Sequence, residues 1–65
     1  MGDYWCKMEA GRYAKQVGSV RFEIEYDPET KLWHCRRNQE QFDAGRTLRE
    51  AKTYCYEEAR KEAGR

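Results

Sequence analysis

Residues 20–26 read Val-Arg-Phe-Glu-Ile-Glu-Tyr, in which apolar and charged side chains alternate without interruption. A period of two is typical of a β-strand that buries one of its faces. Asp27 and Pro28 come next and favour a type I turn. Residues 32–37 then read as a second strand, so we expect an antiparallel hairpin.

The side chains also indicate the register of this hairpin. One register brings the apolar side chains together on one face and pairs opposite charges on the other, each pair contributing about 0.2–1 kcal/mol. A shift of one residue would set Trp33 and Cys35 against acidic side chains. Lys31 falls where loops of this shape often need glycine in the left-handed conformation. The expected pairs are Asp27–Leu32, Tyr26–Trp33, Ile24–Cys35, Glu25–His34 and Glu23–Arg36.

A helix is expected from about residue 47 to residue 63. Thr47-Leu48-Arg49-Glu50 is a capping box, in which the threonine and glutamate side chains bind free amides at the helix start. The apolar positions recur at helical spacing and are mostly small, which lets the helix approach a sheet closely. These positions are Leu48, Ala51, Cys55 and Ala59. We expect the helix to pack on the face formed by Val20, Phe22, Ile24 and Tyr26.

The other segments are less distinctive. Residues 38–45 indicate a short third strand with Phe42 turned inward. Residues 3–17 fit a helix capped by Asp3, with Cys6, Ala10, Tyr13 and Val17 on one face. They also fit a strand in which Tyr4, Cys6 and Met8 alternate before a turn at Ala10-Gly11. We favour the helix, because good helix formers dominate the segment.

Composition places the chain among small folded domains. Thirteen basic residues nearly balance 12 acidic ones, and nine aromatic residues supplement a small aliphatic content. We expect residues 1–65 to form a single α+β domain, with a two- to three-stranded antiparallel sheet and a thin, aromatic core. No apolar run is long enough to span a membrane and no signal-peptide pattern is seen, so we expect a cytoplasmic protein.

Catalytic and metal-binding patterns are missing from the sequence. The three cysteines Cys6, Cys35 and Cys55 form no CxxC pair, and zinc would need all of them and a fourth ligand. An odd number of cysteines suits a reducing compartment, in which buried thiols act as small apolar groups. The chain has one histidine, one serine and no glycine-rich phosphate loop. We expect no enzyme activity, no cofactor and no metal ion.

Two families resemble parts of the chain. Strand, turn, strand and a short extended piece lead to Gly45-Arg46-Thr47-Leu48-Arg49-Glu50-Ala51, and over residues 20–63 this order resembles the HicB-type antitoxin domain. The same stretch is similar to the second half of a double-stranded-RNA-binding domain, with Arg49, Ala51 and Lys52 at its basic element. The first resemblance implies a regulatory protein that binds another protein, and the second implies RNA binding.

Two classes of function follow from these observations. The favoured one is a small regulatory or inhibitory protein, antitoxin-like or of the kind encoded by phages, that docks on a larger protein or ribonucleoprotein. Aromatic and arginine side chains anchor many interfaces, and we do not expect Trp5, or one of Tyr54 and Tyr56, to be fully buried. A short sheet also leaves an edge on which a second copy can pair. The expected partner-binding residues are Trp5, Tyr54, Tyr56, Arg36 and Arg37.

The alternative function is a nucleic-acid-binding module. Basic side chains surround the helix start, where free amides also attract phosphate, and two arginines end the second strand. Nearby glutamates weaken this positive field. The residues expected to carry this alternative are Arg36, Arg37, Arg46, Arg49 and Lys52.

Overall fold

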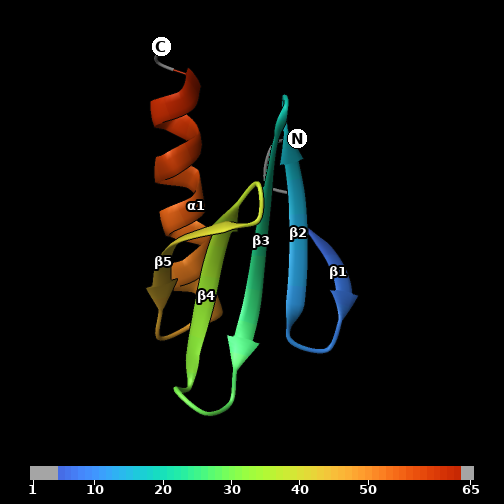
Figure 1. Cartoon of the computed structure of the whole chain (residues 1–65), viewed down its shortest axis with the longest axis vertical. Coiled ribbons are helices and arrows are strands. Elements are labelled where there is room, and N and C mark those ends of the chain that lie inside the picture. The colour runs from blue at the N-terminus through green and yellow to red at the C-terminus, as the bar shows by residue number, and fades with distance from the viewer. Residues whose placement is uncertain (1–4, 64–65) are drawn as a thin grey trace.

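The computed structural model describes residues 5–63, which form a five-stranded antiparallel sheet and one helix (Figure 1). The strands lie side by side in chain order. The α+β class is confirmed, and the sheet has more strands than the two or three expected. The elements are β1 (Cys6–Glu9), β2 (Arg12–Val17), β3 (Val20–Asp27), β4 (Leu32–Arg37), β5 (Glu40–Gly45) and α1 (Leu48–Ala63).

The hairpin of β3 and β4 has the register expected from the alternation. Ile24 lies opposite Cys35 and Tyr26 opposite Trp33, while Glu25 faces His34 on the other side. In the turn, the Asp27 side chain accepts a hydrogen bond from the Glu29 amide at 3.0 Å, and Lys31 takes the left-handed conformation with φ of 60°. The alternation therefore predicted the pairing, and the shape of the loop predicted the left-handed conformation at Lys31.

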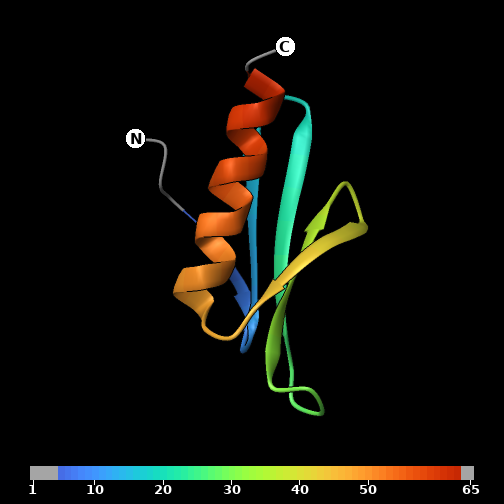
Figure 2. The same cartoon turned by 90° about the vertical axis from the view of Figure 1, so that its left-hand side faces the viewer.

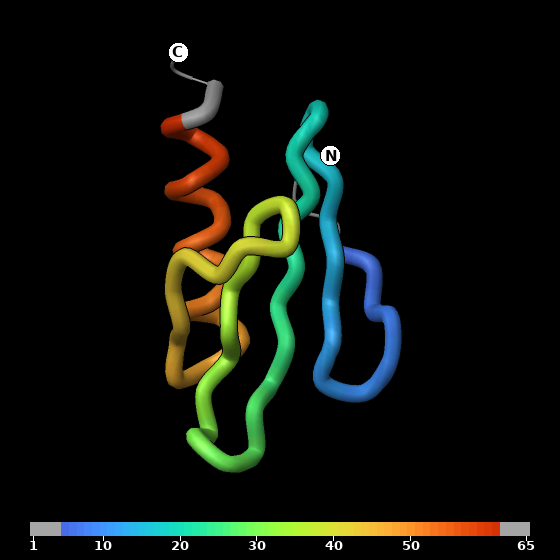
Figure 3. The backbone as a smooth tube through the Cα atoms, in the orientation of Figure 1, coloured from blue at the N-terminus to red at the C-terminus, as the bar shows by residue number. Residues whose placement is uncertain are grey.

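The expected helix over residues 3–17 is wrong, because this segment forms β1, β2 and the tight turn between them (Figure 3). Gly11 takes a φ of +78° in that turn, which glycine adopts without strain. The pairing of β2 with β3 places Tyr13 opposite Ile24. It also satisfies the backbone hydrogen-bonding groups of β3, which would otherwise be an edge strand of the sheet. This gain overrides the local helix propensity. Asp3 and Tyr4 lie outside the described residues.

Strand β5 is the expected third strand, and it is irregular. Its pairing with β4 skips Phe42, which is the extra residue of a β-bulge. The Phe42 ring packs edge-on against Phe22, with 6.2 Å between the ring centres. The bulge therefore turns Phe42 into the core, as the sequence indicated.

The helix begins at the expected capping box. Thr47 Oγ1 accepts a hydrogen bond from the Glu50 amide at 3.1 Å. The Glu50 carboxylate accepts one in return from the amide of Arg46 at 2.8 Å, one residue earlier than the cap residue expected from the sequence. Gly45 lets the helix approach closely, because a Cβ at this position would lie 2.9 Å from the Ala51 backbone nitrogen.

The helix covers one face of the sheet only, over β3, β4 and β5 (Figure 2). The core between the two layers contains Val20, Phe22, Ile24, Cys35, Ala51 and Cys55. Tyr26 was expected in this contact surface, but it lies beyond the helix start and is 37% exposed. Trp5 closes the core from the N-terminal side. We refer to the uncovered side of the sheet as the open face.

Candidate functional site

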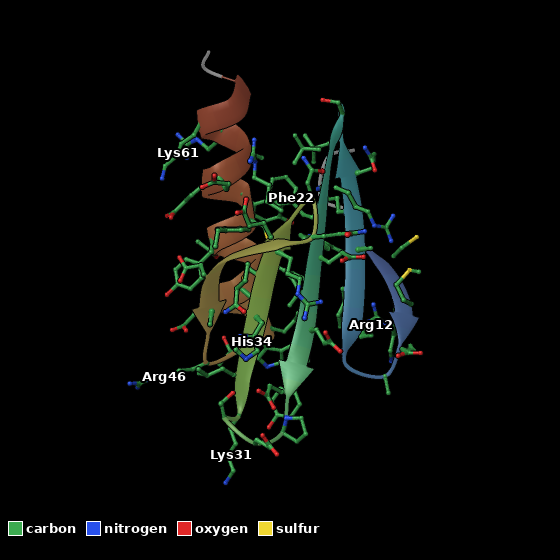
Figure 4. All side chains as sticks on the ribbon, in the orientation of Figure 1. Arg12, Phe22, Lys31, His34, Arg46 and Lys61 are labelled. Carbon is green, nitrogen blue, oxygen red and sulfur yellow. The ribbon has the colours of Figure 1, made fainter. Side chains whose placement is uncertain are left out.

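Among the described residues, no helix or strand lies over the open face of the sheet. Residues directly opposite each other in neighbouring strands share a face, so the register identifies its members. Figure 4 looks onto this face, on which the labelled Arg12 of β2 and His34 of β4 lie. Its central members are Arg12, Ala14, Gln16, Arg21, Glu23, Glu25, His34 and Arg36.

The three arginines of the open face each lie beside a carboxylate. Arg36 Nη1 is 3.0 Å from a Glu25 oxygen, and Arg21 Nε is 3.1 Å from Glu23. Arg12 is 3.5 Å from Glu9 at the end of β1. Exposed pairs of this kind contribute only about 0–1 kcal/mol each to stability. They give the face an alternating charge pattern and hold the arginine heads in defined positions.

An apolar hollow of about 200 Å³ lies where β1 meets β2 on the open face. Met8 stands at this hollow with 57% of its surface exposed, and the small, buried Ala14 also lines it. Cys6, Lys15, Gln16 and Arg21 complete the lining. Methionine and arginine are both enriched in protein interfaces. This end of the face therefore combines an exposed apolar side chain with a depression beside it.

A second, polar hollow of about 240 Å³ lies by the turn between β3 and β4. His34 is fixed there from both ring nitrogens. Gln41 Nε2 lies 2.8 Å from Nδ1, while the Asp27 carboxylate lies 3.4 Å from Nε2. The hydrogen bond from the Glu29 amide, with help from Thr30 and His34, holds the pKa of Asp27 below its usual value. The lining consists of Glu25, Tyr26, Asp27, Pro28, His34 and Arg36.

This polar hollow does not have the geometry of a nucleophilic triad. A triad needs the acid on one ring nitrogen of the histidine and the hydroxyl on the other. Here the Thr30 hydroxyl, at 3.4 Å, and Asp27 both approach Nε2, while Gln41 occupies Nδ1. Among residues 5–63, no three histidine, cysteine or acidic side chains are grouped so that they would hold a metal ion.

Both edges of the sheet carry features that discourage pairing with another strand. β1 has only four residues, and its register shifts between Lys7 and Glu9. β5 carries the bulge at Phe42 and begins at Glu40. Bulges, short length and charged side chains are the usual means by which proteins blunt an edge. Pairing of two copies through an edge stays a prediction.

Of the three aromatic residues expected to bind a partner, Trp5 belongs to the core, and Tyr54 and Tyr56 pack against it. Trp5 is buried but not fully so, with 9% of its surface exposed, and its indole N–H donates to the Tyr56 hydroxyl at 3.1 Å. Lys15 lies over the Tyr56 ring, 5.0 Å from its centre. Tyr54 is half-buried and sits among carboxylates, with Glu50 the main cause of its raised pKa. Tyr54 and Tyr56 both remain partly exposed, as expected for at least one of them.

The predicted basic residues do not form one surface. Arg36 belongs to the open face, whereas Arg37 lies opposite Phe22 on the helix side of the sheet. Successive strand residues point to opposite faces, which separates the two arginines. The Lys52 ammonium lies 5.6 Å from the Tyr13 ring centre, also on the helix side. The exposed side chains of Arg46 and Arg49 lie at the helix start.

Sequence reasoning missed Met8, Arg12 and Arg21 as members of the site. Arg12 and Met8 lie in the segment expected to be a helix, so their position on a sheet face did not follow. Arg21 alternates with the apolar residues of β3, and this pattern alone assigned it to the face away from the core. The alternation was the signal that could have identified it.

No protein-family model matches this chain, and neither the curated proteins nor the solved structures contain a significant match. Within the described part of the chain, the single helix is too short and too polar to cross a bilayer.

Proposed function

We propose that this protein is a small, non-catalytic regulatory or inhibitory protein that docks on a larger protein through the open face of its sheet. The observation that carries the proposal is the one-sided covering of the sheet by α1. On the uncovered side, Met8 and Arg21 line one hollow and Arg36 lines the other. The rigid sheet fixes these side chains before binding, which lowers the entropy lost on association.

The charge pattern favours a protein partner over a nucleic acid. Each arginine of the open face has a carboxylate within 3.5 Å, so a phosphate would meet acidic groups at every position. A protein surface of mixed charge can exchange these pairs for pairs across the interface, and such complementarity supports specificity and fast association. The protein component of a ribonucleoprotein also presents a surface of mixed charge, so it is a suitable partner in the same way.

The resemblance of residues 20–63 to the HicB-type antitoxin domain supports a regulatory setting, either as an antitoxin-like protein or as a phage protein that inhibits host machinery. We propose a cytoplasmic location, because the three cysteines are free thiols, which suits a reducing compartment. The contacts of His34 support a non-catalytic role. The Thr30 hydroxyl and the Asp27 carboxylate lie at the same ring nitrogen, and Gln41 lies at the other one.

The test compares three variants of the immobilised full chain in capture from a lysate treated with nuclease. Met8→Asp and Arg36→Glu alter the open face, whereas Arg60→Glu alters an exposed helix position as the matched control. Circular dichroism checks that each variant folds. The affinity for the captured protein should fall at least about tenfold in both open-face variants and stay unchanged in the control. Unchanged affinity in both open-face variants, or a loss in the control alone, would contradict the proposal.

A titration separates the alternative function from the favoured one. Duplex RNA and duplex DNA are added to the wild-type protein at low and at moderate salt. We expect no binding at either concentration. Micromolar binding that weakens steeply with salt, and that disappears in Arg49→Glu, would instead support the nucleic-acid module.

A further inference from the structure

Two of the three cysteines meet inside the core, between the sheet and the helix. Cys35 lies at the centre of β4 on the helix side and has no exposed surface, and Cys55 on α1 is 1% exposed. The Cys35 sulfur lies 3.5 Å from the carbonyl oxygen of Ala51, one helical turn before Cys55. Side chains on a helix lean toward its N-terminus, so the Cys55 sulfur extends over this same turn.

The two thiols belong to the same buried cluster, and each is the main influence on the pKa of the other. Their contact requires a close approach of helix and sheet, which the small residues on both sides allow. Ala51 is fully buried on the side of α1 that faces the sheet. At Gly45, where the chain passes close to the start of α1, there is no room for a side chain. Cys6 is exposed on the open face and takes no part in the pair.

We propose that Cys35 and Cys55 are a redox modification site, at which a peroxide or a low-molecular-weight disulfide converts two buried thiols into a disulfide that joins β4 to α1. The site goes beyond the docking function and does not depend on it. It lies on the opposite side of the sheet from the open face, so the modification leaves that face unaltered.

With hydrogen peroxide, the sulfur of one cysteine attacks one oxygen, and the O–O bond breaks. The products are a sulfenic acid and hydroxide, which becomes water by taking the thiol proton. The second sulfur then displaces the hydroxyl group as another water molecule and forms the S–S bond. Two thiols have lost two hydrogen atoms, and the peroxide has been reduced to water.

The two thiols also change each other's acidity. The hydrogen bond from Cys55 lowers the pKa of Cys35, although burial opposes this change. The hydrogen bond to Cys35 and then burial raise the pKa of Cys55.

The test measures a redox equilibrium, because burial slows the rate without changing the end point. A Cys6→Ser variant removes the exposed thiol and keeps the core intact. It is equilibrated in glutathione buffers of graded composition, once folded and once in denaturant. Free thiols are then blocked with an alkylating reagent, and mass spectrometry gives the fraction that has lost two hydrogen atoms. Peptide mapping identifies the linked residues.

The folded chain should become half oxidised in a buffer at least about tenfold more reducing than the denatured chain requires, since the fold already holds the sulfurs together. The oxidised protein should, for the same reason, unfold at a higher temperature than the reduced protein. If the folded chain needed a buffer as oxidising as the denatured chain does, or more oxidising, to become half oxidised, the proposal would be overturned. A disulfide that lowers the unfolding temperature would also overturn it.

Discussion

Replacing Trp5 by alanine should remove a large part of the stability of this domain. The indole is 9% exposed, donates a hydrogen bond to Tyr56 and lies under the Lys15 ammonium. Substituting alanine for a buried tryptophan costs about 3–5 kcal/mol. A chain of this length has a total stability of roughly 3–10 kcal/mol. The variant should therefore be partly unfolded in the absence of denaturant, or close to that point.

Urea unfolding followed by tryptophan fluorescence and circular dichroism measures this effect. Met8→Ala is the matched control, because Met8 also belongs to the N-terminal hairpin but is 57% exposed, and it should change the stability by less than about 0.5 kcal/mol. Tyr56→Phe removes only the acceptor of the indole hydrogen bond and should cost about 0.5–1.5 kcal/mol. A loss below about 1 kcal/mol in Trp5→Ala would refute the conclusion that Trp5 closes the core.

Three further predictions concern the helix start and the β3–β4 turn. Thr47→Ala removes the N-cap and should lower the stability by about 1 kcal/mol in thermal unfolding, whereas Thr53→Ala, within the exposed helix surface, should have almost no effect. Gly45→Ala should cost about 1–3 kcal/mol in urea unfolding, because the new Cβ meets the Ala51 nitrogen at 2.9 Å; full stability would contradict the close approach. Asp27 has a pKa below its usual value of 3.8, so the stability it contributes is present above pH 3.8 and is lost as the pH falls through its lower folded value. Asp27→Asn should weaken this acid dependence in unfolding at graded pH, and an unchanged profile would contradict the assignment.

The hairpin and the helix were predictable because each rests on local sequence patterns. The alternation around Ile24 allows a single register with Cys35, and a slip would expose every apolar side chain. The cap at Thr47 marks the helix start within one residue. These features depend on residues close together in the chain, and the sequence displays them directly.

The N-terminal strands were not predictable in the same way. Residues from Cys6 to Val17 satisfy both a helical and an alternating pattern. The choice between them depends on the pairing of β2 with β3, which local propensity does not reflect. The position of Trp5 followed from this choice, because the hairpin brings it against Tyr56, 51 residues later in the chain. The burial of Trp5 therefore depends on a long-range contact, which composition alone could not predict.

The candidate site was only partly predictable for the same reason. Arg36 was identified from its place on a charged strand face, and the structure places it on the open face. Met8 and Arg12 join that face only because β1 and β2 extend the sheet. A face built from several strands is a property of the whole sheet, so single segments show only part of it.

The most direct test of docking through the open face is cross-saturation in the complex with the captured protein. The small protein is deuterated and labelled with ¹⁵N, and the partner's protons are irradiated. The account predicts that the amide signals of Met8, Arg12 and Arg36 lose intensity while those of Arg60 and Lys61 on α1 keep theirs. Attenuation confined to the helix, with the signals of the open face unchanged, would contradict it.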